Sequence, residues 1–278
     1  MASVVTLTTD FGTADGYVGA MKGVIAEIAP QARVIDLTHD IPHGDVRGAA
    51  FALYRAVPYY PPDSVHCVVI DPGVGTARRA LAVRTEGRQY LVGPDGGAFT
   101  LFCPPFSDAV PEAVELSEPR WWRAGHDLSA TFHGRDIFAP VAAHLARQIE
   151  TGDADLEVFG PRARRLRRFE VPAPVEERDA YRGEVVHVDH FGNAITNLPE
   201  RWVAAHPEAP VIAEAGGKAM PVVRTYGDVR SGDLCALVGS AGWLEVACRD
   251  GSAADRLGLA PGIPVVLRRT APRARPLS

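Results

Sequence analysis

Cysteine is scarce in this sequence, and the spacing of the few cysteines excludes several kinds of site. The 278 residues include only 4 cysteines, which lie far apart and form no CxxC pair. Cys67 and Cys235 lie inside apolar runs. This pattern fits neither a disulfide framework nor a cysteine zinc site, so we expect a reduced, cytoplasmic chain.

Long apolar runs and an excess of basic charge are also missing. Nowhere do 18 apolar residues follow one another, so no membrane span is expected. The segment from Met1 to Asp10 has neither a basic start nor a long apolar stretch, and we expect it to form a strand rather than a signal peptide. The net charge of -5 is not typical of nucleic-acid binding, and the basic run Arg162 to Arg168 is expected to be a solvated linker.

Several motifs of nucleotide-binding proteins are absent. The sequence has no Walker loop, and Gly73-Val74-Gly75 lacks the third glycine of a dinucleotide-binding fingerprint. Asp10-Phe11-Gly12 resembles the kinase magnesium triplet, but no strand lysine motif or catalytic loop accompanies it. A kinase and a dinucleotide-dependent enzyme are therefore excluded.

The composition is that of a soluble globular protein with room for two domains. Apolar residues make up 46% of the chain and charged residues 23%. Strands and helices alternate in the first part, whereas short strands without helical periodicity follow a charged, proline-containing stretch. We predict an α/β domain at residues 1–165, a linker at 166–180 and a second domain at 181–278.

The N-terminal domain is predicted to open with a βαβ unit. Val4 to Leu7 form a β-prone run, and Arg33 to Leu37 form a second one. Between them, apolar residues recur at helical spacing, with Thr13 or Asp15 as a cap and Pro30 as the stop. Further elements follow: a helix with Asp45 as its N-cap and apolar positions from 46 to 57, strands at 65–70, 80–84 and 89–92, and a helix that begins near His133.

The second domain is predicted to be all-β. Its short apolar runs are punctuated by Gly, Asn and Asp, as in a small antiparallel barrel or sandwich. The predicted strands are 184–188, 194–197, 211–214, 222–225, 234–238, 244–248 and 264–267.

Three polar residues have the side chains that hold and activate a water molecule. Asp71 directly follows the buried strand 65–70 and opens a glycine-rich turn, and Arg78 lies seven residues later. His133 lies at a helix start, where the macrodipole disfavours a protonated imidazole. A carboxylate and an imidazole can accept or steer protons, and a guanidinium can fix the carboxylate. The alternative is an ordinary Asp–Arg turn pair and an unrelated histidine.

Two clusters of histidine and aspartate offer a metal site as another alternative. His187 and Asp189 would share one face of a strand, with His190 beside them. The second cluster extends from His39 to Asp45. Neither has the spacing of a zincin, an EF-hand or a Cys/His zinc site, so we expect no metal.

Five short motifs occur in order along the chain: Thr8-Thr9-Asp10-Phe11-Gly12, Asp71-Pro72-Gly73-Val74-Gly75-Thr76, Phe132-His133-Gly134-Arg135-Asp136, Asp189-His190-Phe191-Gly192-Asn193 and Ser240-Ala241-Gly242-Trp243-Leu244-Glu245. Together they resemble the S-adenosylmethionine hydroxide adenosyltransferase family, the SAM hydrolases related to fluorinating and chlorinating enzymes. The similarity extends from residue 4 to about residue 268 and covers both predicted domains.

The resemblance implies a fold, an assembly and a reaction. The implied fold is an N-terminal α/β domain with a mostly parallel sheet and a C-terminal antiparallel β-barrel. The implied assembly is a homotrimer with sites between the N-terminal domain of one subunit and the C-terminal domain of the next. Water or hydroxide would attack the ribose C5′ of S-adenosyl-L-methionine and give adenosine and L-methionine, with no cofactor and no nucleic-acid or membrane partner.

The resemblance also implies residue roles. By similarity, Asp71, Arg78 and His133 form the water-activating triad. The substrate-binding residues divide by the part of the substrate that they would bind: Asp10 the ribose hydroxyls, Asn193 and Tyr226 the adenine, and Asp189 and Ser240 the ends of the methionine, with Glu245 and the backbone around Cys248 completing the pocket.

The halide-transferring relatives are the nearest alternative reaction. They have a tyrosine where this chain has Asp71, and the fluorinating branch has a serine at the position of Gly134. Gly239, Trp243 and Arg249 differ from the usual asparagine, tyrosine and asparagine of the family. A protein that binds adenosine or SAM without turnover, and a metal-dependent hydrolase, are the alternatives from other classes.

Overall fold

The computed structural model describes residues 2–103, 111–125, 127–204 and 211–269. The chain divides into two compact units, Met1–Phe169 and Glu170–Ser278. Cys67, Cys103, Cys235 and Cys248 are buried free thiols. None of the helices in the described ranges has the length and apolar character that a membrane crossing requires.

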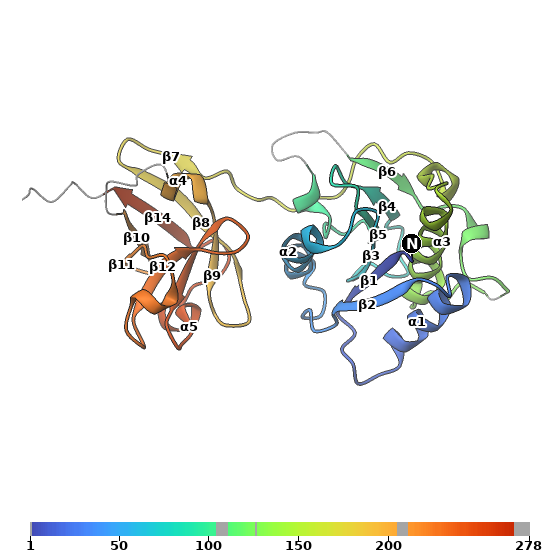
Figure 1. Ribbon diagram of the computed structural model, residues 1–278, viewed down its shortest axis with the longest axis horizontal. Coiled ribbons are helices and arrows are strands. Elements are labelled where there is room, and N and C mark those ends of the chain that lie inside the picture. The colour runs from blue at the N-terminus through green and yellow to red at the C-terminus, as the bar shows by residue number, and fades with distance from the viewer. Residues whose placement is uncertain (1, 104–110, 126, 205–210, 270–278) are drawn as a thin grey trace, which may run out of the picture. The chain divides into compact units, whose positions relative to one another are not determined.

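The first unit is built on a six-stranded sheet with the strand order β2-β1-β3-β5-β4-β6 (Figure 1). Strand β1 pairs in parallel with β2 and β3, and β3 pairs in parallel with β5, whereas β4 is antiparallel to β5 and β6. The predicted α/β class is therefore confirmed, with β4 as the strand of opposite direction. The strands are β1 Val4–Thr9, β2 Arg33–Thr38, β3 Val65–Val69, β4 Ala80–Arg84, β5 Tyr90–Pro94 and β6 Glu112–Glu115.

Helices cover both faces of this sheet. Helices α1 and α3 pack against one face, where Cys67 and Val69 of the central strand β3 point, and α2 packs against the other, where Val68 points. This alternation follows from the period of two in a strand and explains why β3 is buried throughout and apolar except for His66. The helices are α1 Tyr17–Ile28, α2 Val46–Ala56 and α3 Ala139–Thr151; one turn of π-helix, η4 Gly134–Phe138, precedes α3, and short 3₁₀ turns lie at η1 Val57–Tyr59, η2 Thr100–Phe102, η3 Pro119–Trp121 and η5 Leu156–Phe159.

The helix starts test the capping predictions. Asp45 is the N-cap of α2, and its carboxylate accepts a hydrogen bond from the Gly48 N–H at 2.8 Å, as predicted. The predicted caps of α1, Thr13 and Asp15, are wrong, because the helix begins at Tyr17 after Gly16 with no side-chain cap bond. Tyr17 packs against Phe11 and Phe132 there, so a tertiary contact coincides with the start.

The second unit is an antiparallel sheet in the order β11-β10-β14-β8-β9-β13-β12, with β7 paired to β8 (Figure 1). Its two edges meet where Val222 bridges to Ala236 of β12, and the Val223 N–H donates to the Ala236 carbonyl at 2.8 Å. The sheet is thus nearly closed around an apolar core, and the barrel prediction is confirmed. The elements are β7 Val175–Glu176, β8 Ala180–Val188, β9 Ala194–Pro199, α4 Glu200–Ala204, β10 Val211–Ala215, β11 Lys218–Pro221, η6 Tyr226–Asp228, β12 Leu234–Val238, β13 Trp243–Cys248, α5 Ala253–Leu257 and β14 Pro264–Arg269.

One predicted strand, 222–225, is wrong. Gly216 and Gly217 adopt positive φ values of 54° and 72° and form a tight turn, so the next strand starts at once as β11, Lys218–Pro221. After Pro221 the chain leaves the ladder and makes only the bridge to β12. The apolar pair Val222-Val223 therefore closes the barrel rather than forming a strand of its own.

Candidate active site

The first part of the site is the turn that follows β3. Asp71 comes directly after Ile70, which is 1% exposed, and the turn is closed by hydrogen bonds from the Val74 N–H to the Asp71 carbonyl and from the Thr76 N–H to the Gly73 carbonyl, both at 3.1 Å. Gly75 has a φ of 76°, and a Cβ there would lie 2.7 Å from the Ala130 carbonyl oxygen. Only glycine fits this conformation and this close approach. The turn thereby reverses the chain and brings Arg78 into contact with Asp71.

Arg78 and Asp71 form a buried, two-pronged ion pair. The Arg78 Nε donates to Oδ1 and Oδ2 of Asp71 at 2.9 and 3.0 Å, and one Arg78 NH2 group also bonds to Oδ2. The two side chains are only 8% and 7% exposed. The guanidinium lies over the ring of Phe138, with 5.2 Å between its central carbon and the ring centroid. This geometry fixes both charges in one orientation.

His133 is the third member of this group. Its Nδ1 lies 2.6 Å from the same NH2 group of Arg78. Because a guanidinium has donors and no acceptor, Nδ1 is the acceptor, and the neutral ring carries its proton on Nε2. Burial lowers the pKa of His133, the charge of Arg78 lowers it further, and Asp71 and Asp136 act in the opposite direction. His133 is thus a neutral imidazole that can donate from Nε2.

Asp10 lies at the same edge of the sheet. Strands β1 and β3 are parallel neighbours with Thr9 opposite Val69, so the loops after them begin side by side. The Asp10 Oδ2 accepts the Gly44 N–H at 2.8 Å and lies 3.3 Å from the His43 Nδ1. The Asp10 side chain is 5% exposed. A second buried carboxylate therefore lies at the same edge of the sheet as the turn that carries Asp71.

The loop that carries Asp10 is held by contacts of Thr9 and His39 that the sequence did not predict. The Thr9 hydroxyl lies 2.9 Å from the Nδ1 of His39 and accepts the Phe11 N–H at 3.2 Å. The His39 Nε2 lies 3.0 Å from a carboxylate oxygen of Asp36. The sequence indicates part of this arrangement, because His39 directly follows the strand that pairs with β1 and so lies near the end of β1.

The C-terminal unit contains a second candidate pocket. This hollow has a volume of about 800 Å³, and its lining includes three of the predicted substrate-binding residues, Asn193, Tyr226 and Cys248. Phe191 and Arg249 line it too. Tyr226 is 40% exposed, which leaves part of its ring open to a ligand.

Asp189 shapes the turn at this pocket. Its Oδ1 accepts the backbone N–H groups of Phe191 and Asn193, both at 2.9 Å. Its Oδ2 accepts the side-chain Nδ2 of Asn193 at 3.2 Å. These bonds orient the Asn193 amide, so that its nitrogen faces Asp189 and its oxygen is available as an acceptor.

Glu245 and Ser240 belong to the adjoining hairpin. The Tyr226 hydroxyl lies 3.5 Å from the Asn193 Nδ2 and donates to Glu245 Oε2 at 3.4 Å, so these three side chains meet. Any Cβ at position 239 would overlap the Glu245 carboxylate, which explains why Gly239 suits this chain. Ser240 lies in the exposed β12–β13 turn and is not among the residues that line the pocket.

The residues of the two metal-like clusters have other partners. Across the ranges that the structure describes, no group of three or more His, Cys, Asp or Glu is placed to hold a metal ion. Asp189 accepts three N–H groups of its own turn, and the ring of His190 packs edge-on against Phe191 at 5.6 Å. In the cluster from His39 to Asp45, Asp45 caps α2.

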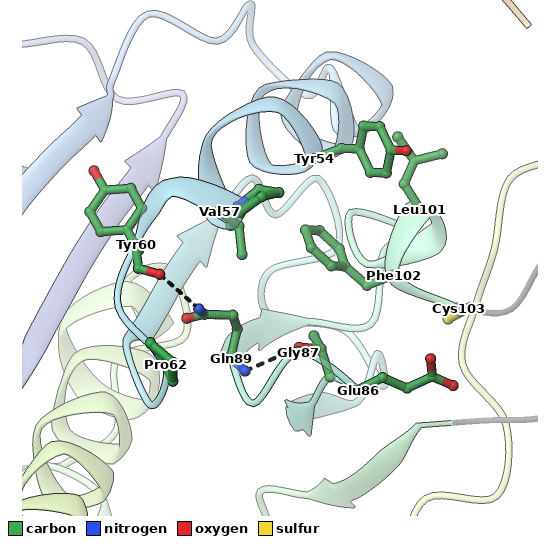
Figure 2. A pocket seen from close by; sticks show the side chains of 12 residues that line it. Tyr54, Val57, Tyr60, Pro62, Glu86, Gly87, Gln89, Leu101, Phe102 and Cys103 are labelled. Atoms are coloured by element: carbon green, nitrogen blue, oxygen red, sulfur yellow. Dashed lines mark hydrogen bonds between the residues drawn. The ribbon is translucent and has the colours of Figure 1, made fainter. Parts of the chain in front are cut away.

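Another hollow, of about 700 Å³, lies in the first unit beside the end of α2 and the turn between β4 and β5 (Figure 2). Its walls include Tyr60 and Phe102 but no member of the triad. The buried Gln89 donates from Nε2 to the carbonyls of Tyr60 and Pro61 at 3.1 Å each, and its Oε1 lies 3.2 Å from the His66 Nε2. The Gln89 amide therefore has internal partners at both of its polar atoms.

Comparison with known proteins gives matches along most of the chain. Residues 5–154 match the family model described as the SAM hydroxide adenosyltransferase N-terminal domain, and residues 183–266 match the C-terminal domain of the same family. The chain is 45% identical to the (R)-S-adenosyl-L-methionine hydrolase of Salinispora tropica, over 93% of this chain and 95% of that one. It is 44% identical to the protein of the same name from Thermus thermophilus, over 93% of this chain and 97% of that one.

A solved structure shares the fold. The crystal structure of an uncharacterized conserved protein from Thermotoga maritima superposes with a TM-score of 0.84 at 37% sequence identity, covering 95% of this chain and 99% of that one.

Proposed function

The chain belongs to the SAM hydroxide adenosyltransferase family, and we propose that it hydrolyses S-adenosyl-L-methionine to adenosine and L-methionine. The name of these relatives, (R)-S-adenosyl-L-methionine hydrolase, specifies the R form of the substrate. We extend this to the present chain and propose that the R epimer at sulfur is the preferred substrate.

The observation that carries the proposal is the arrangement of Asp71, Arg78 and His133. Arg78 holds the Asp71 carboxylate and the His133 ring at once. A water between them would donate one hydrogen bond to Asp71 and accept one from the His133 Nε2. Such a water would be fixed in orientation and polarised toward hydroxide.

The reaction balances with these groups alone. The water oxygen attacks the ribose C5′, a C–O bond forms, and the C5′–S bond breaks with its electron pair moving to sulfur. A water proton passes to the Asp71 carboxylate and then to solvent. The sulfonium leaves as neutral methionine, an excellent leaving group, so positioning supplies much of the acceleration and proton transfer adds a factor of roughly 10² to 10⁴.

The remaining predicted residues would bind the substrate. With one oxygen of Asp10 held by Gly44, its Oδ1 would accept a ribose hydroxyl. Asn193, Tyr226 and the backbone at Cys248 would hold the adenine, supported by their place in one pocket. Roles for Asp189 and Ser240 at the ends of the methionine, and for Glu245 in completing the pocket, rest on the family resemblance.

Incubation of the pure protein with S-adenosyl-L-methionine and excess EDTA tests this function. We expect equimolar adenosine and methionine, with faster loss of the R epimer than of the S epimer. Asp71→Asn, which keeps the shape of the side chain, should reduce the rate by at least about 10²-fold. Absence of adenosine, or formation of S-adenosylhomocysteine instead, would contradict the proposal. Loss of activity on removal of metal would favour the metal-dependent alternative.

The family resemblance extends the proposal to the assembly. We propose a cytoplasmic homotrimer with sites shared between subunits. The solution mass from light scattering tests the trimer, and a monomeric mass at the concentrations of the assay would contradict it.

A further inference from the structure

Arg249 is one of the positions at which this chain departs from the family pattern, and it bonds to two neighbouring turns of the barrel. It follows β13, and its backbone is anchored to the neighbouring turn: its N–H donates to the Asp233 carbonyl at 3.0 Å, and its carbonyl accepts the Gly232 N–H at 2.8 Å. From this fixed base its side chain extends along the edge of the C-terminal pocket, which it helps to line.

The guanidinium of Arg249 binds the turn that carries Tyr226. One NH1 group donates to the Val229 carbonyl at 2.6 Å and to the Gly227 carbonyl at 3.4 Å. These carbonyls lie at the C-terminal end of the short helical turn η6, where backbone acceptors lack partners within the turn. The N-terminal end of the same turn is capped separately by Thr225 and Asp228.

Tyr226 has few other restraints. Its ring is 40% exposed, and its hydroxyl makes contacts of 3.4 and 3.5 Å, which are at the long end for hydrogen bonds. The position of the ring in the pocket therefore depends on the backbone of η6. Arg249 holds the exit of that turn, and the Thr225 cap holds its entry.

We propose that Arg249 is a positioning residue for the nucleoside: by binding the Gly227 and Val229 carbonyls, it holds Tyr226 where the ring can pack against the adenine. The inference rests on the proposed function and deepens it. It assigns to Arg249 a share of substrate affinity rather than of the chemical step, because a preformed aromatic wall reduces the ordering cost of binding.

The test compares Arg249→Met with Arg268→Met. Arg268 lies on β14 in the same unit, where it is 46% exposed and pairs with Glu214, outside the proposed site. For Arg249→Met we expect KM for S-adenosyl-L-methionine and Kd for adenosine, measured by calorimetry, to rise about 10-fold while kcat changes less than about twofold. Arg268→Met should leave all three unchanged. Unchanged KM and Kd in Arg249→Met, or a fall in kcat alone, would overturn the proposal.

Two further readouts separate positioning from other roles. Amide hydrogen exchange at residues 226–229 should accelerate in Arg249→Met, whereas a guanidinium that contacts the ligand directly would leave this exchange unchanged. Arg249→Lys has one ammonium group in place of the guanidinium, and we expect it to recover only part of the affinity. Nearly full recovery, with unchanged exchange at 226–229, would indicate direct charge recognition and contradict the positioning role.

The outcomes also distinguish this proposal from the proposed function. If the wild-type chain binds adenosine but does not turn over S-adenosyl-L-methionine, the hydrolase proposal fails and Arg249 is judged by the adenosine Kd and the exchange data. A wild-type chain that neither binds adenosine nor turns over the substrate contradicts both.

Discussion

A single NH2 group of Arg78 lies 2.6 Å from the His133 Nδ1 and also bonds to Asp71. Because this nitrogen can only donate, the contact fixes His133 as the neutral tautomer with its proton on Nε2. In the proposed mechanism His133 would donate a hydrogen bond to the attacking water, and Asp71 would accept its proton. The two residues have different roles although both belong to the triad.

Arg78 should be required as a guanidinium and not only as a charge. In Arg78→Lys, one ammonium group cannot bind both Asp71 oxygens and the His133 ring, so kcat should fall about 10²-fold with little change in KM. Steady-state kinetics measures this. Arg78→Met would leave the buried Asp71 carboxylate unpaired and should lower the free energy of unfolding by about 3–5 kcal/mol. Wild-type kcat in Arg78→Lys would show that the bridge is dispensable.

The pH dependence of kcat should report on His133. Its pKa lies below the ordinary value, mainly through burial and next through Arg78, so the ring stays neutral as pH falls through about 6.5. Activity should therefore persist at pH 6.5 and decline only at lower pH, as protonation removes the Nδ1 acceptor. His133→Gln retains an amide that can donate and should keep more activity than His133→Ala. Because this amide does not titrate, the decline at low pH should be absent from His133→Gln. The same decline of kcat at low pH in His133→Gln would show that another group titrates.

His66 should make the fold sensitive to acid. Its ring is buried between Thr6 and Gln89, and burial lowers its pKa to about 4. The unfolded chain gains this proton near pH 6.5 and the folded chain does so only near pH 4, so stability is complete above 6.5 and is lost as pH falls toward 4. The loss should be about 3 kcal/mol. Urea unfolding at several pH values should show a shallower decline in His66→Gln; equal slopes would contradict this assignment.

Gly134 should tolerate a side chain poorly. A Cβ there would lie 3.3 Å from both the Met21 sulfur and a Phe132 ring carbon, and 3.4 Å from Val69. Gly134→Ser should destabilise the fold by about 1–3 kcal/mol and slow hydrolysis. It should form no 5′-halogenated adenosine in chloride or fluoride, because Asp71 and its partners are unchanged. Gly134→Ala is the control for volume, and halide transfer by Gly134→Ser would contradict the role given to the triad.

Asn193 should favour adenosine over inosine. Its amide nitrogen faces Asp189, so its oxygen is available to accept from the 6-amino group of adenine and repels the 6-oxo group of hypoxanthine. Calorimetry should give a Kd for inosine at least about 10-fold above that for adenosine. In Asp189→Ala the Asn193 amide loses this partner and can rotate by 180°, so the ratio of the inosine Kd to the adenosine Kd should decrease. Equal affinities of the wild type for adenosine and inosine would show that Asn193 does not recognise the 6-amino group.

Much of the fold could be predicted from the sequence because its signals are local. The β-prone runs before Asp10 and Asp71 predicted strands at both places, and both are present as β1 and β3. The structure adds that these two strands are parallel neighbours. The predicted cap at Asp45 required only its position before an apolar helix.

The remaining features depend on contacts between distant residues. The bond between Arg78 and His133 joins positions 55 residues apart, and spacing alone could not indicate it. The start of α1 coincides with the packing of Tyr17 on Phe132 rather than with a cap. The position of Arg249 on the carbonyl of Val229 follows from how the barrel brings two turns together.

The central claim, attack of a water held by the triad on the ribose carbon, is tested most directly by hydrolysis in H₂¹⁸O with EDTA present, followed by mass spectrometry of both products. The account predicts one ¹⁸O atom in the adenosine, at the 5′ oxygen, and none in the methionine, with the rate lost in Asp71→Asn. Unlabelled adenosine, label in the methionine, or undiminished labelling by Asp71→Asn would contradict it.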